Sequence, residues 1–484
     1  MKLHSSKKEA CGVFGIRSLD GRDVSKMIFN GLVTLQHRGQ EASGISTLNE
    51  NHIHLKKSLG LVNASYSEKT LGNLKGSMGI GHVRYSTVGT STITDAQPFK
   101  RDYPRKGLVV AHNGNLVNYI DMRNILMKEG RNFESTCDAE IIANKLADEL
   151  VKTKDIEKSV YNYMEAAEGS YSAGMFTGER ELIAFRDPNG IRPFSFGVND
   201  KLAIFASESV ALNINGIDET HDIKPGEMIL FNEDGKTERK HLMKGERKHC
   251  MFEYVYFSRP DSVIEEKWVY DVRIELGRSL AKTYSSEADV IVPIPDTSRS
   301  AAEGISRETG IHVAEGLMKN RYIYRTFIMP EQRTRALSVD MKLNPVKSVL
   351  KDKHVLLVDD SIVRGTTTRK IAEMVRKAGA KKIDLWITCP PVVSPCFYGI
   401  DIATHNELIA FKHKVEEIQK ITKVDSLCYQ TIDSLVKSIG LGENICKACL
   451  TGEYPTCMAQ KIADRMKTQK NLEQKRYYEI AHKC

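Results

Sequence analysis

The chain has 484 residues and a formal net charge of +8, and 41% of its residues are hydrophobic. One core rarely supports such a length, so we expect two domains of about 200 residues or more. No apolar run approaches the roughly 20 residues of a membrane helix, which argues against a membrane-spanning protein. The modest positive charge suits small anionic substrates and does not demand nucleic acid. We therefore expect a cytoplasmic protein that binds neither membranes nor nucleic acid.

The first ten residues, MKLHSSKKEA, precede a Cys-Gly pair. They are too polar to be a secretion signal, and we interpret residues 1–10 as a removable propeptide. Cleavage before Cys11 would leave a thiol and a free α-amine on one residue, and an amine with a pKa of roughly 7.7–8.0 is a suitable base for that thiol. On the Cys-Gly pair alone, a buried structural cysteine on a first strand is the favoured alternative.

Three segments that follow Cys11 favour a catalytic cysteine over a structural one: QHRGQEASGIS (36–46), GIGHVRYSTVG (79–89) and VVAHNGNLVNY (109–119). In the last of them an apolar strand runs into Asn113 and Gly114, whose side-chain amide and backbone N–H can together stabilise a developing oxyanion. In order and chemistry the segments resemble the glutaminase domain of N-terminal-nucleophile amidotransferases. The resemblance implies an α+β fold, an αββα sandwich, with Cys11, Asn113 and Gly114 as catalytic residues.

The same resemblance assigns the glutamine-binding residues. Arg84 would bind the α-carboxylate of glutamine, and Asp138 in TCDAE would bind its α-ammonium group. As isolated residues, each would more often belong to a surface ion pair. Cys137 stands where a small hydroxyl residue is usual, and Arg38 is expected to brace the site without touching substrate. Two apolar segments, residues 181–185 and 201–206, are predicted as further strands of the sandwich.

In the second half, VLLVDDSIVRGTTT (355–368) joins an apolar strand to two acids and a turn rich in hydroxyl groups. Apolar residues then recur at helical spacing over 369–380. Ligands bind where the strands of an open parallel sheet end, and N–H groups, hydroxyls and a helix N-terminus favour a phosphate there. Asp359 and Asp360 would face ribose hydroxyls and a Mg²⁺ ion. The alternative is a strand that ends in a solvated acidic turn.

This run closely resembles the phosphoribosyl pyrophosphate (PRPP) motif of type I phosphoribosyltransferases, which have an α/β fold. The implied PRPP-binding residues of the motif are Asp359, Asp360, Ser361, Arg364, Gly365, Thr366 and Thr367. A second strand and turn, in residues 288–310, could bind the pyrophosphate through N–H groups. Thr297 in this turn, where Ser is common in the family, would then bind Mg²⁺ with Asp359 and Asp360.

Between these two motifs, residues 319–335 contain regularly placed basic side chains. A basic stripe alone is more often a solvated face. Beside a pyrophosphate site it would neutralise the polyanionic leaving group, and its closure would exclude water from a reactive intermediate. Lys319 and Arg321 are therefore predicted to bind PRPP.

The ten cysteines, without a secretory signal, favour free thiols, metal binding or catalysis over disulfides. Residues 446–449, CKAC, are the only CxxC pair. By itself this pair is compatible with zinc, an iron–sulfur cluster, a redox pair or no ligand at all. Zinc would require a second pair of Cys or His ligands nearby.

Taken together, the two halves resemble the glutamine PRPP amidotransferase family. Members release ammonia from glutamine and transfer it to PRPP, which gives pyrophosphate and 5-phosphoribosylamine for purine synthesis. The resemblance implies one Mg²⁺ ion per subunit, a homotetramer, and feedback inhibition by AMP and GMP. It divides the chain into a propeptide (1–10), a glutaminase domain (11–249), a phosphoribosyltransferase domain (250–454) and a C-terminal helix or tail (455–484).

One branch of that family binds one [4Fe–4S] cluster per subunit through four cysteines. The matching cysteines of this chain are Cys250, Cys396, Cys446 and Cys449. The residues alone could not have selected two of these over Cys389, Cys428 or Cys457.

A second hypothesis is a PRPP- or nucleotide-sensing regulator that has kept the binding fold without catalysis. Such a protein would have little use for Cys11, Asn113 and Gly114 in this arrangement. It would also carry a DNA-binding domain, which we do not find in the sequence. An assay of pyrophosphate release from glutamine and PRPP separates the two hypotheses.

Overall fold

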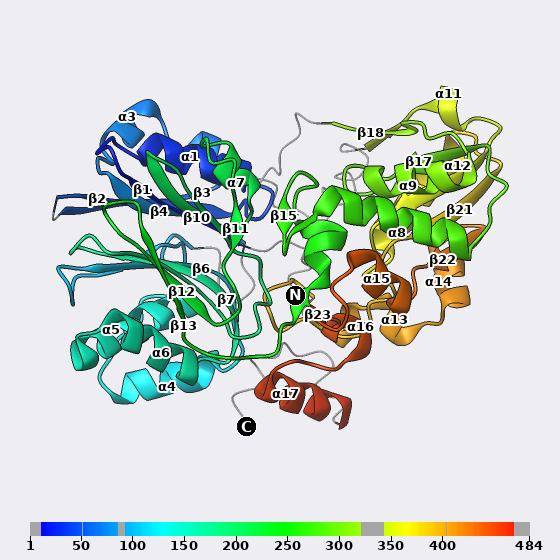
Figure 1. Cartoon of the computed structure of the whole chain (residues 1–484). Helices are drawn as coiled ribbons and strands as arrows, with labels where there is room; N and C mark the ends of the chain where they lie inside the picture. The colour runs from blue at the N-terminus through cyan, green and yellow to red at the C-terminus, as the bar shows by residue number, and fades with distance from the viewer. Residues whose placement is uncertain (1–10, 51, 86–91, 321–342, 403, 469–484) are drawn as a thin grey trace.

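The structure of the chain, a computed structural model, describes residues 11–50, 52–85, 92–320, 343–402 and 404–468. Two lobes lie side by side, one formed by the first half of the chain and one by the second half (Figure 1). Across the described ranges, no helix combines the length and the apolar character needed to cross a membrane.

The first lobe contains two antiparallel sheets. The first sheet has seven strands in the spatial order β11 (His221–Asp222), β9 (Ser195–Val198), β10 (Leu202–Ala206), β1 (Gly12–Ser18), β4 (Met78–Arg84), β2 (Ala42–Asn49) and β3 (His52–Leu59). The second has six, in the order β13 (Thr237–His241), β12 (Glu227–Phe231), β8 (Leu182–Arg186), β7 (Gly169–Thr177), β6 (Leu108–Leu116) and β5 (Phe99–Arg101). Strands β8 and β10 confirm the two strands predicted from apolar segments.

The two sheets stack face to face, and apolar side chains from both fill the space between them. Gly15 of β1 leaves room for this packing, because a Cβ atom there would lie 2.0 Å from the ring of Phe205. Helices cover the outer faces (Figure 1). On the first sheet these are α1 (Ser25–Thr34), α2 (Val62–Ser65), α3 (Glu68–Gly72) and α7 (Val210–Asn213), and on the second α4 (Tyr119–Lys128), α5 (Asp138–Thr153) and α6 (Ile156–Ala166). The predicted αββα sandwich is confirmed.

The second lobe is built on a parallel sheet in the order β17 (Val290–Pro293), β20 (His354–Asp359), β21 (Lys382–Ile387) and β22 (Ser426–Tyr429). Most of its residues are apolar and buried, as expected for a parallel sheet with both faces covered. The larger helices around it are α8 (Val269–Thr283), α9 (Arg299–Thr309), α12 (Thr366–Lys377), α14 (Val415–Thr422) and α15 (Ile432–Ile439). The smaller elements are β18 (Leu317–Lys319), β19 (Leu343–Pro345), α11 (Lys347–Leu350), η2 (His405–Glu407) and α13 (Ile409–Lys412). This lobe has the predicted α/β fold.

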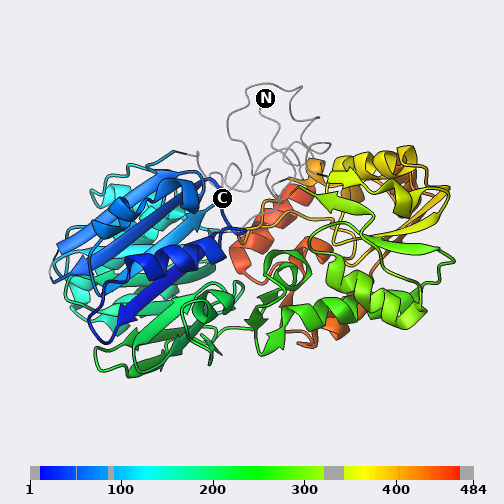
Figure 2. The ribbon, with the colours of Figure 1, turned by 90° about the horizontal axis from the view of Figure 1, so that it is seen from above.

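The lobes meet along a junction with an apolar core of its own. One buried cluster runs from the helices over the six-stranded sheet to the parallel sheet. The junction elements are β14 (His249–Cys250), which pairs with β23 (Ile445–Cys446), the π-helix η1 (Glu253–Phe257), the hairpin of β15 (Val263–Ile264) and β16 (Lys267–Trp268), α16 (Ala448–Thr451) and α17 (Cys457–Thr468). Helix α17 lies at this junction in both views (Figure 1 and Figure 2). There the N–H of Met458 donates to Glu168 of the first lobe.

Candidate active sites

Cys11 stands immediately before β1, whose first residue, Gly12, pairs with Val83 of the neighbouring strand β4. Its backbone carbonyl accepts a hydrogen bond from Nε of Arg38 at 3.1 Å, and its thiol donates to the carbonyl of Tyr85 at 3.4 Å. Burial raises the pKa of the Cys11 thiol above its ordinary value. The thiolate is therefore scarce at neutral pH, and nucleophilic attack requires a base.

Arg38 anchors the start of β1 to the rest of the protein. It is fully buried, with Nη1 2.5 Å from Oε1 of Glu208 and Nη2 2.7 Å from Oε1 of Glu253. Arg192 reaches the same Oε1 of Glu253 at 3.2 Å. All three side-chain nitrogens of Arg38 therefore donate to groups of the protein itself. This agrees with the bracing role expected for Arg38 and explains how the backbone of Cys11 is held.

Asn113 and Gly114 lie near the end of β6, as predicted from the sequence. Nδ2 of Asn113 lies 3.3 Å from the hydroxyl of Ser207, while its buried Oδ1 has no hydrogen-bond partner. Gly114 has a φ of +152°, and a Cβ atom there would lie 2.0 Å from the carbonyl oxygen of Ser170. Only glycine fits at this position, so its backbone N–H can be offered to a ligand without a side chain beside it.

Asp138 begins helix α5, where a negative charge is stabilised by the helix N-terminus. Its carboxylate lies 3.0 Å from Nε2 of His112 and accepts the N–H of Leu116 at 3.0 Å. Burial alone would raise the pKa of Asp138, but His112, Leu116 and Arg84 together lower it below its usual value. Asp138 is therefore a carboxylate at neutral pH, the form that can bind an ammonium group.

Arg84 ends β4 and is buried. Burial opposes its charge, but Cys137, Cys11 and acidic groups nearby raise the pKa of its guanidinium. The charges of Arg84 and Asp138 both act on the thiol of Cys11, so these three groups lie in one neighbourhood. Cys137 belongs to it as well, and burial raises the pKa of its thiol. A nucleophile, a cation and an anion thus stand together, as recognition of an amino acid requires.

The second site lies at the ends of neighbouring parallel strands. Pro293 of β17 pairs with Val358 of β20, so the turns after these strands are adjacent. The hydroxyl of Thr297 donates to Oδ2 of Asp360 at 2.7 Å, and the hydroxyl of Ser361 donates to its Oδ1. The convergence predicted from the two motifs therefore exists. Carboxylate and hydroxyl oxygens are the donors that suit Mg²⁺, so the side chains present here fit that ion.

The turn after β20 closes on Gly365, which has a φ of +73° and directly precedes α12. The helix starts at Thr366, earlier than the predicted Arg369, so Thr366 and Thr367 belong to its first turn. A helix start of this kind presents backbone N–H groups that favour an anion. The predicted anion-binding turn is therefore followed at once by a helix.

Two of the basic side chains predicted to bind PRPP near this turn contact different parts of the second lobe. Arg364 contacts Glu407 at 2.6 Å, and Lys319 forms an ion pair with Asp296 in the turn after β17. Arg321 lies outside the described residues. Lys319 is thus held beside the predicted pyrophosphate turn, whereas Arg364 contacts an acid on η2.

The four cysteines predicted to hold a cluster gather at the lobe junction. Cys250 and Cys446 are paired residues of β14 and β23. The carbonyl of Cys449 accepts the N–H of Ser394, two residues before Cys396. Burial is the main cause that raises the pKa of the Cys449 thiol, and nearby thiols, which include the other three, raise it further. Three segments far apart in sequence therefore bring these four thiols into one region.

This donor set can be tested for its fit to a metal cluster. All nine cysteines within the described residues are free thiols. In the same residues, no three His, Cys, Asp or Glu side chains lie close enough together to hold a metal ion. Cys250 and Cys446 are buried, and Cys396 and Cys449 are partly buried. In kind and number these four thiols match the ligands of an iron–sulfur cluster, so the set fits in its chemistry. Burial raises the pKa of Cys250 to about 12, and a bound cation would reverse that effect.

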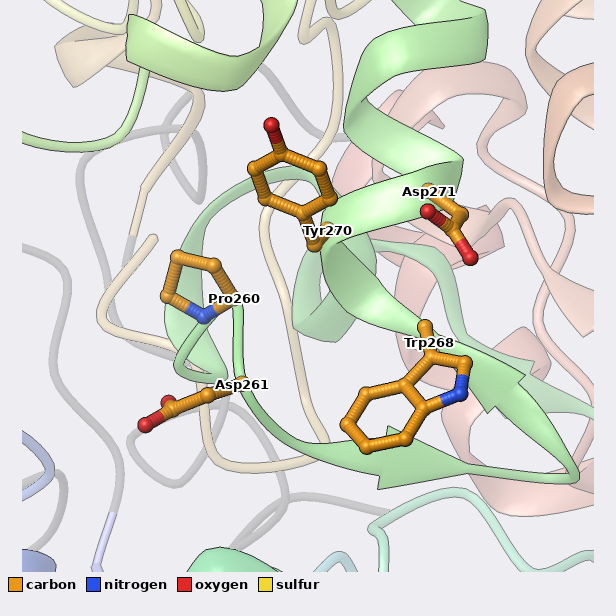
Figure 3. A pocket seen from close by; sticks show the side chains of 5 residues that line it. All are labelled: Pro260, Asp261, Trp268, Tyr270 and Asp271. Carbon is orange, nitrogen blue, oxygen red and sulfur yellow. The ribbon is translucent and has the colours of Figure 1, made fainter.

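A pocket of about 410 Å³ lies elsewhere, next to the start of α8. Figure 3 shows the side chains that line it: Pro260, Asp261, Trp268, Tyr270 and Asp271. It contains none of the residues predicted for either strand-end site. The candidate chemistry therefore lies outside this pocket.

Comparison with known proteins matches both lobes. The family model described as a glutamine amidotransferase domain matches residues 82–213, and the one described as a phosphoribosyl transferase domain matches residues 269–391. Fold and sites together define a glutamine amidotransferase with a phosphoribosyltransferase domain.

Relatives agree over nearly the whole chain. The amidophosphoribosyltransferase of Methanothermobacter thermautotrophicus is 45% identical, covering 95% of this chain and 97% of that protein. That of Methanocaldococcus jannaschii is 46% identical, covering 92% and 98%. The structure of glutamine PRPP amidotransferase from Bacillus subtilis, complexed with ADP and GMP, has a TM-score of 0.85 and 39% identity, covering 93% and 98%. This chain belongs to the amidophosphoribosyltransferase family, and the catalytic interpretation is supported over the regulator.

Sequence reasoning missed two residues of the first site. His112 contacts Asp138, and Ser207 contacts Asn113. His112 directly precedes Asn113, so its position in the motif was a usable signal. Ser207 follows strand β10, more than 90 residues beyond its partner, and no local pattern connects the two.

Proposed function

We propose that this protein is a glutamine-dependent amidophosphoribosyltransferase that uses Cys11 for glutamine hydrolysis and the turn at Asp359 and Asp360 for PRPP. The observation that carries the proposal is the presence of two separate strand-end sites in one chain. One places a thiol near Arg84 and Asp138, and the other places two consecutive carboxylates shortly before a helix start that suits a phosphate. The products are glutamate, pyrophosphate and 5-phosphoribosylamine, which commits PRPP to purine synthesis.

At the first site, the thiolate of Cys11 attacks the side-chain amide of glutamine. Because burial raises the pKa of this thiol, a base must take its proton, and the α-amine exposed by removal of residues 1–10 supplies one. Arg84 and Asp138 hold the α-carboxylate and α-ammonium groups. Asn113 and Gly114 stabilise the tetrahedral oxyanion. Ammonia leaves, and water then cleaves the glutamyl thioester to release glutamate.

At the second site, the pyrophosphate of PRPP leaves C1 of the ribose, and ammonia adds to the same carbon. Asp359, Asp360 and Thr297 would hold one Mg²⁺ ion, which supplies neutralising charge for the leaving group. The N–H groups from Gly365 to Thr367, with Ser361, hold the 5-phosphate. Lys319 stands beside the turn that receives the pyrophosphate, and Arg321 and Arg364 complete the predicted cationic set. No covalent enzyme intermediate is required there.

The four thiols at the junction would hold one [4Fe–4S] cluster with a structural role. Neither half-reaction transfers electrons, so the cluster would tie the C-terminal segment to the lobe junction. We also propose binding of the purine nucleotides AMP and GMP as feedback inhibitors and a homotetrameric cytoplasmic enzyme. The Bacillus subtilis relative complexed with ADP and GMP supports nucleotide binding.

Mutation of Cys11 tests the two-site scheme. We expect Cys11→Ala to abolish glutamine-dependent pyrophosphate release while added ammonia still supports it, because the second site does not need the thiol. Cys457→Ala, an exposed thiol, is the control and should keep both activities. Intact-mass measurement of the active protein should give a chain that begins at Cys11. Absence of pyrophosphate release with both nitrogen sources in the unmodified protein would contradict the proposed function.

A further inference from the structure

The loop from Cys396 to Asp401 of the second lobe lies directly against the strands that carry the first site. Nδ2 of Asn115 in β6 donates to the carbonyl of Phe397 at 2.8 Å. The hydroxyl of Ser170 in β7 donates to the next carbonyl, that of Tyr398, also at 2.8 Å. Both donors are buried. Two consecutive carbonyl groups of one lobe are therefore held by two side chains of the other.

The register of the sheet explains why both donors face the loop. Asn115 and Ser170 are directly paired residues of the antiparallel strands β6 and β7, so their side chains share a face of the sheet. The residue that follows in the loop, Gly399, lies close to the backbone of Gly114. A Cβ atom on Gly399 would lie 3.2 Å from the carbonyl carbon and oxygen of Gly114. The loop therefore passes so close to the predicted oxyanion-binding residue that a side chain at Gly399 would press against its backbone.

The other side of the loop is fixed within the second lobe. The ring of Phe397 stacks on that of Tyr454, with 4.5 Å between ring centroids. The hydroxyl of Tyr398 lies 3.0 Å from that of Thr456, at the start of α17. The N–H of Cys396 donates to the carbonyl of Ile402 at 2.8 Å. A loop held at this many points can act as a fixed support for the strand that it touches.

We propose that Asn115 and Ser170 are positioning residues, which hold Gly114 in its catalytic position by fixing it to the loop 396–401. This inference rests on the proposed function, because it assumes that the N–H of Gly114 meets the oxyanion. An oxyanion donor acts only at about 2.7–3.1 Å, and a displacement of about 1 Å costs about a hundredfold in rate. The second lobe thereby sets the geometry of glutamine hydrolysis in the first.

The test separates positioning from general stability. In the full-length protein we expect Asn115→Ala and Ser170→Ala to lower kcat for glutamine hydrolysis about tenfold to a hundredfold. The KM for glutamine should stay within about twofold, because Arg84 and Asp138 are untouched. Pyrophosphate release with added ammonia should also be unchanged. It requires a folded second lobe, so it reports on the fold of each variant.

Asn118→Ala is the matched control. Asn118 makes the same kind of bond, from Nδ2 to the carbonyl of Ala166 at 2.8 Å, but without contact to the loop. Its kcat for glutamine should equal that of the unmodified protein. An unchanged kcat in Asn115→Ala and Ser170→Ala would overturn the inference. An equal loss of glutamine- and ammonia-dependent activity would also overturn it, since the two residues would then be structural. If the unmodified protein lacked glutaminase activity, the proposed function itself would fail.

Discussion

Ser207 decides what the side chain of Asn113 can do. Its hydroxyl oxygen already accepts the N–H of Val13 at 3.0 Å, so its one proton is free to be donated. If the amide of Asn113 is turned by 180°, its Oδ1, which otherwise lacks a partner, accepts that proton. Its Nδ2 then becomes the free donor that an oxyanion needs. In that orientation, one buried hydroxyl sets the roles of both amide atoms.

We expect Ser207→Ala to lower kcat for glutamine hydrolysis about tenfold, because the amide of Asn113 loses the contact that orients it. Ammonia-dependent synthesis should be unchanged. Steady-state assays with each nitrogen source measure the two activities. Ser46→Ala is the control, since Ser46 is also buried and donates to a backbone carbonyl, that of His54, at 2.7 Å. Equal kcat values for glutamine in the two variants would show that Ser207 does not orient Asn113.

At the scale of elements, strand β20 and the turn that follows it form the second site. Asp359 is the last residue of the strand, and Asp360, which follows it, is buried and bonded to Thr297 from the neighbouring turn. A carboxylate in this position can bind a metal ion, or it can stabilise the fold by a hydrogen bond between two turns. Exchange of both carboxylates for amides distinguishes these roles, because an amide keeps the shape and loses the charge.

For the double variant Asp359→Asn with Asp360→Asn we expect kcat/KM for PRPP to fall at least about a hundredfold. Glutaminase activity measured alone should persist, because its residues lie in the other lobe. Asp289→Asn is the control at the opposite end of the same sheet, where Asp289 accepts the N–H of His354 at 2.8 Å. Unchanged PRPP kinetics in the double variant would remove both residues from the proposed site.

How far the sequence predicts such elements depends on the distance between partners. The strand β20 and the body of α12 follow from local patterns, although the helix starts before the predicted Arg369. The contact of Thr297 with Asp360 follows from the rule that parallel strands end at one edge. The network of Arg38 with Glu208 and Glu253 follows from neither. Its members lie 170 and 215 residues apart, and only the folded chain brings them together.

At the scale of the whole molecule, the two lobes are joined by polar contacts as well as by a shared core. Arg38 in the first lobe meets Glu253 of η1, and Tyr85 donates to Asp401 at 2.9 Å. Arg38, which holds the start of β1, and Tyr85, which follows β4, thereby contact the second lobe. These contacts join the lobe of the thiol site to the lobe that would consume ammonia. Since free ammonia is lost or protonated in water, a fixed junction favours its transfer.

The junction also contains the four thiols, and their proposed cluster gives the last prediction. Protein purified without oxygen should contain about four iron atoms per chain. Cys446→Ser should lose this iron and lower the melting temperature by at least about 5 °C, because the binding energy of the metal is part of the folding energy.

Cys457→Ser is the matched control, since this exposed thiol begins α17 and is outside the proposed ligand set. It should keep its iron and its melting temperature. Iron analysis and thermal unfolding need no assay of activity, so they test the cluster apart from catalysis. Iron-free protein with full activity and an unchanged melting temperature in Cys446→Ser would make these four cysteines ordinary thiols that hold no metal. The junction would then be held by its apolar core and by its polar contacts, among them the Arg38–Glu253 pair.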